Sequence, residues 1–250
     1  MSAGTTHIRG PLHRAARGIA RKVYVTARYR GRRYLCPCCQ TRFRRLASHG
    51  TPPQPNRACP NCRALERHRL LWLYLSRELS ILSRSYRVLH VAPERAIRRR
   101  LASAPDLTYV TTDLNMPEAT VRAMLNRLPF EDACFDVVIC SHVLEHVDHD
   151  VDAMSEMHRV LAPTGQALIM VPVNRRLSET YEDPSITDPD ARKRAFGHQG
   201  HVRYYGRDVT SRFEKAGFDV EPLEYVDHMR PSEAERIRAS RGEVIYICRR

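Results

Sequence analysis

From residue 86 onward, short apolar segments alternate with segments whose apolar residues recur at helical spacing. Strands of a sheet are expected at Tyr86–Ala92, Thr108–Asp113, Phe135–Ser141, Gln166–Val171, Val220–Tyr225 and Val244–Cys248. Helices are expected at Arg95–Ala102, His149–Leu161 and Arg207–Ala216. Strands that alternate with helices at this spacing are typical of a parallel, doubly wound sheet. We therefore expect an α/β domain with a Rossmann-like sheet and helices on both faces.

Two cysteine pairs precede this domain, in the segments Cys36-Pro-Cys-Cys39 and Cys59-Pro-Asn-Cys62, with residues 40–58 between them. A Cys-x-x-Cys turn brings two sulfurs to one metal ion, and two such turns complete a tetrahedron. We expect Cys36, Cys39, Cys59 and Cys62 to hold one structural zinc ion, with Cys38 as a spare thiol. Clustered cysteines without a secretory signal favour metal over disulfides and a cytoplasmic location.

The chain is predicted to have three parts, which are a basic segment (1–34), a zinc-ribbon-like module (35–63) and the α/β domain (64–250). A helix over 64–82 is expected to join the last two, because its apolar residues follow a three-then-four spacing. No run of about 18 apolar residues is present, so no transmembrane helix is expected.

The net charge of +13 is concentrated near the N-terminus, because residues 1–70 contain 16 of the 41 Lys and Arg residues but only one acid, Glu66. Leu12, Ala16, Ile19 and Val23 are spaced as in a basic amphipathic helix. Such a segment attracts RNA, an anionic membrane surface or a phosphorylated substrate, and a location at the membrane periphery is one alternative. A helix packed on the protein itself, or a solvated basic face, accounts for the same pattern.

Four segments carry the functional signal. Tyr86–Glu94 ends a strand in a tight turn, and Tyr109–Asp113 ends the next strand in a carboxylate about 20 residues later. That spacing suits an acid that binds a ribose diol. The other two segments are Leu128–Val147, with LPF, FD and VLEHV, and Met157–Ile169, with RVLAPTG.

The last two segments resemble the LPF…FD…VLEHV…RVLKPGG stretch of class I S-adenosylmethionine-dependent methyltransferases of the type 11 kind, and the resemblance spans about residues 86–225. It implies that the cofactor lies along the carboxyl ends of the strands. Asp113 would then bind the ribose hydroxyls, and Ser141 and His142 would flank the methionine moiety and the reacting methyl group.

The sequence departs from this pattern at the cofactor loop. Ala92-Pro-Glu94 stands where the family has Gly-x-Gly, His90 replaces the usual acid, and the acid that binds adenine is missing, with Asn126 nearby. A bacterial subset of the family with a four-cysteine module and a VLHxAPE turn is similar, and Leu65–Trp72 matches its helix. The predicted cofactor residues are His90, Ala92, Glu94, Asp113, Asn126, Ser141 and His142.

A second histidine-rich stretch, Phe196–Gly206, lies in a region that often covers the substrate in this fold. His198 and His201 are candidates for a general base, an anion site or a divalent metal site, and a structural loop cluster explains them as well. The predicted catalytic residues are His142, His198 and His201.

The abundance of histidine favours O-methylation of a small molecule or of a glycan, lipid or antibiotic precursor. The segment Cys140-Ser-His142 lacks the Asn/Asp-Pro-Pro-Tyr pattern of enzymes that methylate exocyclic amines of bases. One alternative is a ribosomal RNA methyltransferase whose basic module follows phosphates. Another is a non-catalytic zinc-ribbon binding protein with a degenerate methyltransferase domain.

Overall fold

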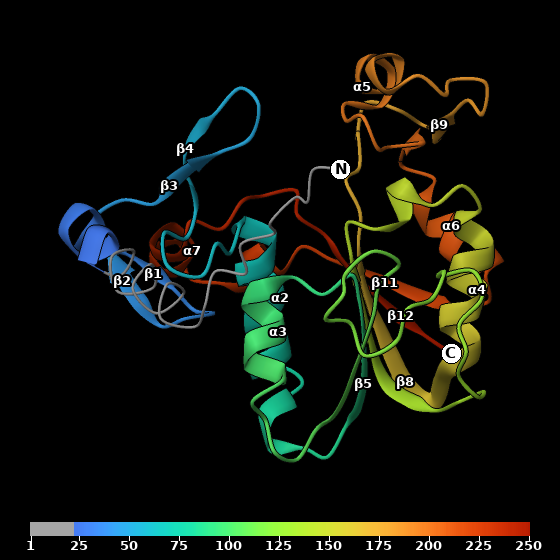
Figure 1. Cartoon of the computed structure of the whole chain (residues 1–250), viewed down its shortest axis with the longest axis horizontal. Helices are drawn as coiled ribbons and strands as arrows, with labels where there is room; N and C mark the ends of the chain where they lie inside the picture. Colours follow the sequence, from blue (N-terminus) through green and yellow to red (C-terminus); the bar gives the residue numbers. More distant parts are fainter. Residues whose placement is uncertain (1–22) are drawn as a thin grey trace, which may run out of the picture.

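The computed structural model describes residues 23–250 and is built around a six-stranded sheet with the order β11-β12-β8-β7-β5-β6 (Figure 1). The strands are β5 (Arg87–Val91), β6 (Thr108–Thr112), β7 (Phe135–Ser141), β8 (Leu161–Met170), β11 (Asp219–Leu223) and β12 (Ile245–Arg249). The first four strands run parallel to one another. Their carboxyl ends therefore meet at one edge of the sheet, where ligands bind in open α/β folds.

The prediction of a wholly parallel sheet is wrong at β12, which runs antiparallel to both β8 and β11. Residues 224–244 form η3 (Tyr225–His228) and α7 (Pro231–Ile237) and do not form a helix that crosses over the sheet. The chain therefore returns in the opposite direction. An apolar strand pattern contains no information about direction, so the sequence alone did not reveal this reversal.

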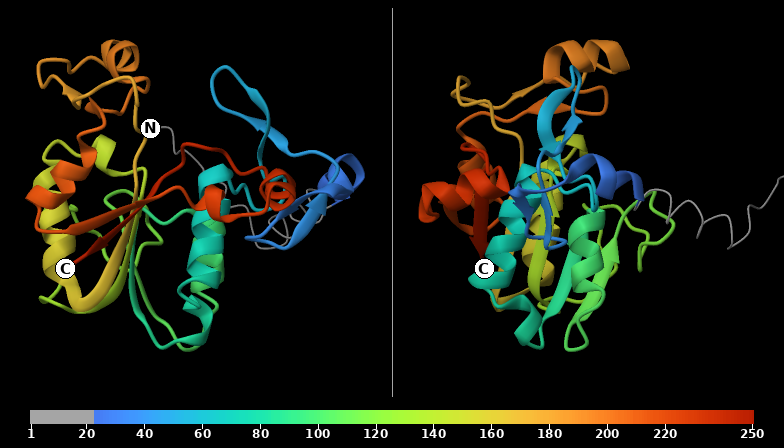
Figure 2. Two further views of the ribbon diagram at one scale, coloured as in Figure 1. Left: turned by 180° about the vertical axis from the view of Figure 1, so that it is seen from behind. Right: turned by 90° about the vertical axis from the view of Figure 1, so that its left-hand side faces the viewer.

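Helices cover both faces of the sheet, as expected for a doubly wound fold. Along β7, Val137 and Ile139 pack in one core with α2 (Glu66–Arg77) and α3 (Arg95–Leu101). Val138 and Cys140 face the other core, with α4 (Asp150–Val160) and α6 (Val209–Lys215). This alternation follows from the period of two in a strand. Figure 2 shows the two helical layers on opposite sides of the sheet.

Cys36 and Cys39 lie in the first of two short hairpins, formed by β1 (Arg30–Cys36) with β2 (Thr41–Phe43). Cys59 and Cys62 follow directly after the second hairpin, formed by β3 (Ala47–His49) with β4 (Gln54–Ala58). The apolar core of these hairpins is continuous with the α2–α3 side of the sheet. Residues 23–29 are helical, whereas residues 1–22, with most of the predicted basic amphipathic helix, lie outside the described residues.

A buried arginine ties the hairpins to the rest of the molecule. Arg69 on α2 has no exposed surface, and its guanidinium donates hydrogen bonds to four backbone carbonyls. These are the carbonyls of Arg57, Ala64, Ile237 and Arg238. Helix α2 ends at Arg77, earlier than predicted, because Ser80 adopts a left-handed conformation with φ of 48° and only η1 (Ile81–Ser83) follows.

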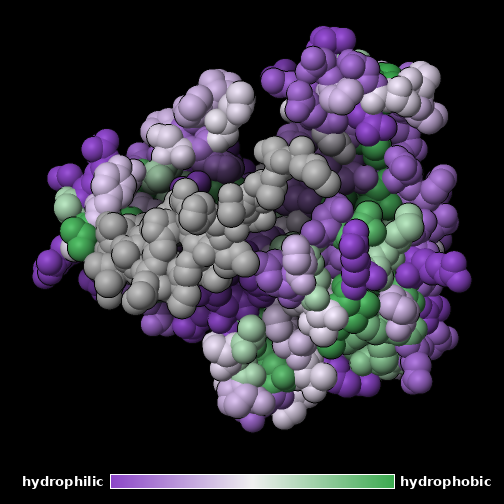
Figure 3. Space-filling model, viewed as in Figure 1, coloured by the Kyte–Doolittle hydropathy of each residue, from purple (hydrophilic) through white to green (hydrophobic). Residues whose placement is uncertain are grey.

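A small lobe extends beyond the carboxyl ends of the strands and contains β9 (Tyr181–Glu182), α5 (Pro189–Phe196) and β10 (Arg203–Tyr204) (Figure 1). Helix α5 was not among the helices expected from the sequence. Figure 3 shows that the surface of this lobe is predominantly hydrophilic in that view. Among the described residues, none of the helices has the length and apolar character needed to cross a bilayer.

Candidate active site and metal centre

A cavity of about 610 Å³ opens at the carboxyl ends of β5, β6 and β7. Four of the predicted cofactor residues line it, namely Ala92, Asp113, Asn126 and His142. They come from four separate segments of the chain, so the fold brings them together. The other three, His90, Glu94 and Ser141, do not line this cavity. His90 and Ser141 are buried at the ends of β5 and β7, with 0% and 5% of their surface exposed.

Two residues that line the cavity adopt strained backbone conformations. Ala92 has φ of 43° and His142 has φ of 56°, both in the left-handed region. Their N–H groups donate to Thr112 O and Met170 O, each at 2.8 Å, which fixes both turns against neighbouring strands. A residue with a Cβ pays roughly 1–2 kcal/mol for this conformation. Ala92 thus keeps the backbone conformation that glycine favours, with only a methyl group added.

The carboxylate missing from position 90 is supplied by Glu94. His90 Nε2 lies 2.8 Å from Glu94 Oε2, and His90 Nδ1 lies 2.8 Å from the Tyr109 hydroxyl. Burial alone would raise the pKa of Glu94, but the hydrogen bond and charge of His90, helped by His68 and Ser141, lower the pKa to about 2. The cofactor loop therefore retains a largely buried negative charge, displaced by four residues along the chain.

This acid also connects the loop to helix α2. His68 Nε2 lies 3.7 Å from Glu94 Oε1, and His68 Nδ1 accepts the N–H of Leu65. Burial lowers the pKa of His68 to about 4. Glu94 Oε1, His68 Nε2 and Ser141 Oγ are buried without a hydrogen-bond partner among the described residues. Unpaired buried polar atoms are costly, so such a group of them is typical of a place where a ligand or ordered water belongs.

Asp113 is positioned by the loop that it begins. Its Oδ1 accepts the N–H groups of Asn115 at 2.6 Å and Met116 at 2.7 Å. These two bonds use the acceptor capacity of Oδ1 and leave Oδ2 to receive further donors. A single carboxylate oxygen can accept both hydroxyls of a diol, so the residue fits the predicted ribose contact.

His142 forms a pair with a buried acid. Its Nδ1 lies 3.2 Å from Oε1 of Glu145, which is 1% exposed. Burial alone would raise the pKa of Glu145, but the hydrogen bond and charge of His142 lower it. A carboxylate at Nδ1 favours the tautomer that keeps the proton there and leaves a lone pair on Nε2. This is the arrangement of an oriented general base.

The structure brings together the two other predicted catalytic residues, His198 and His201, and adds His146 to them. One ring nitrogen from each of these histidines lies within 4.8 Å of the others. His146 also lines the cavity, so the cluster lies at its rim. His146 is not predicted from the sequence, because more than 50 residues separate it from the other two and no local spacing links them.

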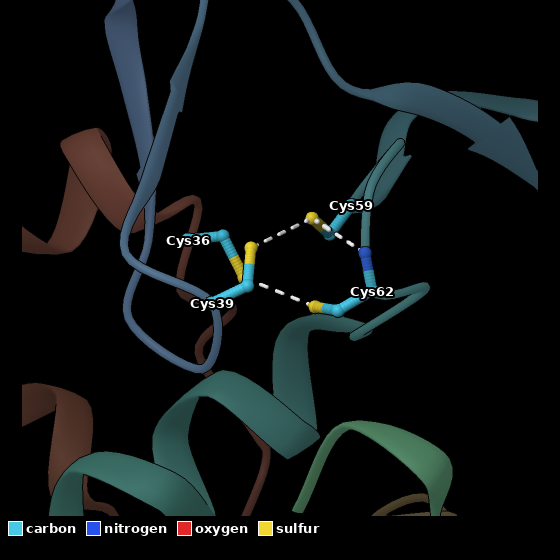
Figure 4. Close-up of side chains that lie close together, drawn as sticks. All are labelled: Cys36, Cys39, Cys59 and Cys62. Atoms are coloured by element: carbon cyan, nitrogen blue, oxygen red, sulfur yellow. Dashed lines mark hydrogen bonds between the residues drawn. The ribbon is translucent and has the colours of Figure 1, made fainter. Parts of the chain in front are cut away.

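The four cysteines converge as the sequence predicts (Figure 4). Cys36 Sγ lies 3.5 Å from Cys62 Sγ, and Cys39 Sγ lies 3.6 Å from Cys59 Sγ. A tetrahedral site with Zn–S bonds of about 2.3 Å has sulfurs about 3.8 Å apart. All eight cysteines of the chain are free thiols. The donor set and its geometry therefore fit one zinc ion with a closed shell of four thiolates.

Comparisons with known proteins place this site in a family context. The family model described as a methyltransferase domain matches residues 77–169. The ubiquinone/menaquinone biosynthesis C-methyltransferase UbiE of Stutzerimonas stutzeri is 40% identical over 70 residues, 27% of this chain and 27% of that protein. UbiE of Brucella anthropi is 30% identical over 156 residues, which cover 56% of this chain and 54% of that protein. This chain thus spans about a quarter to about half of the length of the curated relatives it matches.

Among solved structures, the Burkholderia thailandensis 1,6-didemethyltoxoflavin-N1-methyltransferase with bound S-adenosylhomocysteine has a TM-score of 0.46 and 16% identity. The match covers 72% of this chain and 76% of that one.

Proposed function

We propose that this chain transfers a methyl group from S-adenosylmethionine, because residues 77–169 match the family model of a methyltransferase domain. The observation that carries the proposal is the convergence of Ala92, Asp113, Asn126 and His142 on one cavity at the ends of parallel strands. Its volume of about 610 Å³ lies within the range of sites for cofactor-sized molecules. Bound S-adenosylmethionine would supply the reactive methyl group as part of a sulfonium.

The side chains around the cavity suit the parts of this cofactor. Asp113 Oδ2 would accept the ribose hydroxyls, and the Asn126 amide would contact adenine. Ser141 and Glu94 are close in sequence to His142 and Ala92, which line the cavity. Their atoms Ser141 Oγ and Glu94 Oε1, which lack hydrogen-bond partners among the described residues, would support the methionine end. Ala92, at the tight turn after β5, would let the backbone come close to the cofactor.

The acceptor proposed here is a hydroxyl group on a small molecule or on a glycan, lipid or antibiotic precursor. Its proton would pass to Nε2 of His142 while Glu145 stabilises the resulting imidazolium. Methyl transfer is otherwise mainly a matter of alignment, so the enzyme has to hold the deprotonated oxygen in line with the sulfonium.

A second candidate is methylation at carbon, favoured by the similarity to the UbiE relatives, which are C-methyltransferases. Removal of a proton from a phenolic hydroxyl makes the neighbouring ring carbon nucleophilic, so the same His142–Glu145 pair would serve. The two candidates differ in the product, because NMR of the methylated acceptor distinguishes an O-methyl from a C-methyl group.

RNA, or an anionic membrane surface, remains the alternative partner of the basic segment. Residues 23–63, which comprise the end of the basic segment and the zinc-ribbon-like module, contain nine arginines and no acid. The proposed base and the three-histidine cluster lie outside this segment, and for this reason we favour a small acceptor. A cytoplasmic protein, peripheral to the membrane if the basic segment binds lipid, fits this proposal.

Isothermal titration of the whole protein with S-adenosylmethionine tests the proposal, with binding in the micromolar range expected. His142→Gln should lower kcat by about 10²- to 10⁴-fold on any accepted substrate, a much larger effect than its effect on cofactor affinity. Absence of binding at millimolar cofactor would refute the enzyme assignment and favour a non-catalytic binding protein.

A further inference from the structure

We propose that His146, His198 and His201 form a second metal site, which takes one divalent transition-metal ion with a preference for nitrogen ligands, such as Zn²⁺. The ring centroids of His146 and His201 are 4.7 Å apart, and those of His198 and His201 are 4.9 Å apart. The candidate ligand atoms lie within 4.8 Å of one another. Zn–N bonds of about 2.0–2.1 Å place tetrahedral ligand nitrogens about 3.4 Å apart, so a small inward movement of these rings would form the protein part of an open zinc site.

The hydrogen bonds of the cluster prepare two of the rings for a metal. His146 Nδ1 lies 2.8 Å from Gly200 O, and His201 Nδ1 lies 3.1 Å from Phe196 O. A carbonyl oxygen only accepts, so both Nδ1 atoms carry the proton and both Nε2 atoms have a free lone pair. Histidines that bind metals are commonly fixed in this way by a backbone carbonyl on the other nitrogen.

The ring of His198 is less well prepared to bind a metal. His198 Nδ1 accepts the N–H of Gly200 at 3.1 Å, so a metal bound at this atom would displace that hydrogen bond. Gly200 itself lies against His146, since an added Cβ would come within 3.1 Å of His146 Nδ1. We therefore expect His146 and His201 to contribute more to affinity than His198.

Charge and position support an ion here. The buried carboxylate of Glu145, adjacent in the chain to His146, has an Oε2 atom without a partner and supplies negative charge beside the cluster. His146 lines the proposed cofactor cavity, so the ion would lie at its rim. Three protein ligands leave at least one coordination position open, unlike the closed shell of the four cysteines.

The role of the ion rests on the proposed methyltransferase function. An acceptor oxygen bound at the open position would lose its proton more readily, and the ion would hold it near His142. Metal binding itself does not depend on that role, so it can be tested separately.

The test measures zinc per chain by elemental analysis after equilibration of the intact protein in buffered micromolar Zn²⁺. The wild type should hold two ions, one in the four-cysteine site and one in the three-histidine site. His146→Ala and His201→Ala should each hold one ion. Loss of a hydrogen bond that supports a ligand weakens metal binding by roughly 10- to 100-fold, and loss of the ligand itself should weaken it at least as much. His149→Ala is the matched control, since His149 is exposed and lines the same cavity outside the cluster, and it should hold two ions.

Cobalt provides a second readout that does not require a variant to fold. Co²⁺ added to protein whose cysteine site holds zinc should give visible bands of a nitrogen and oxygen site, without sulfur-to-metal charge transfer. One zinc per wild-type chain and no such bands would overturn the proposal. S-adenosylmethionine binding, titrated in the same samples, shows separately whether the proposed function fails.

Discussion

The four-cysteine site and the rim of the cavity differ in how their polar atoms are paired. Around the cysteines, each of the four sulfurs faces another sulfur at metal-binding distance, and the site is buried in a core shared with the sheet. At the strand ends, oxygens of Glu94, Thr112, Ser141 and Glu145 are buried without a partner among the described residues. The first arrangement leaves no position for a substrate and stabilises the fold. The second leaves interactions for a ligand to complete.

Removing the zinc should have the largest effect. Structural zinc sites contribute apparent free energies of about 10–16 kcal/mol, so Cys36→Ser should unfold the hairpins. Because their core continues into α2, the melting temperature of the whole chain should fall as well. Cys38→Ser is the control, since the Cys38 thiol donates to the His68 carbonyl at 3.5 Å, a bond that a serine hydroxyl can replace, and Cys38 is not one of the four predicted zinc ligands. A Cys36→Ser protein that lacks zinc yet resists proteolysis across residues 30–62 would contradict a structural role.

Substitution of Arg69 tests whether the two hairpins fold separately from α2 and α7. Arg69→Ala removes four hydrogen bonds to buried carbonyls and should lower the free energy of unfolding by about 3–5 kcal/mol. Arg99→Ala, on the exposed side of α3, should change it by less than about 0.5 kcal/mol. Urea denaturation with zinc bound measures both. Equal effects of the two substitutions would show that the hairpins fold independently of α2 and α7.

Substitution of Asp113 tests whether the cavity at the strand ends binds the cofactor. Asp113→Ala should weaken S-adenosylmethionine binding by about 3 kcal/mol, more than a hundredfold, because two charge-assisted hydrogen bonds to the ribose are lost. Asp113→Asn keeps an oxygen for the N–H groups of Asn115 and Met116, so it separates the ribose contact from the local turn. Unchanged affinity in titration calorimetry for Asp113→Ala would place the cofactor elsewhere.

The sequence predicted the elements of the sheet because buried strands have a local signature. Phe135–Ser141 has the predicted bounds, and the cysteine spacing identified all four converging sulfurs. Strand direction at β12 was missed because it depends on packing against distant segments, whereas helix α5 has local signals that could have found it, namely Asp188 at its N-cap, Pro189 in its first turn and Gly197 at its C-cap. Similarly, spacing predicted Asp113 and the family resemblance predicted His142 as residues of the site, and both line the cavity, whereas His146 joins His198 and His201 only through the fold. The functional roles of these residues remain predictions.

The buried acid of the cofactor loop gives the smallest expected effect, a dependence of stability on pH. The pKa of Glu94 is about 2 in the folded protein, against an ordinary value of 4.5. A lowered pKa means that the charged carboxylate stabilises the fold above pH 4.5, and that this stabilisation is lost as the pH falls from 4.5 towards 2. The full contribution is about 3 kcal/mol at neutral pH, of which about 1 kcal/mol is lost between pH 7 and pH 4.

Glu94→Gln removes the titration while it keeps the size of the side chain. The difference in unfolding free energy between wild type and variant should therefore shrink by about 1 kcal/mol from pH 7 to pH 4. Zinc loss at acidic pH affects both proteins equally and cancels in this difference. If the two stability curves stayed parallel, the His90–Glu94 pair would not hold a charge in the folded protein, and the buried acid would not replace the one missing from position 90.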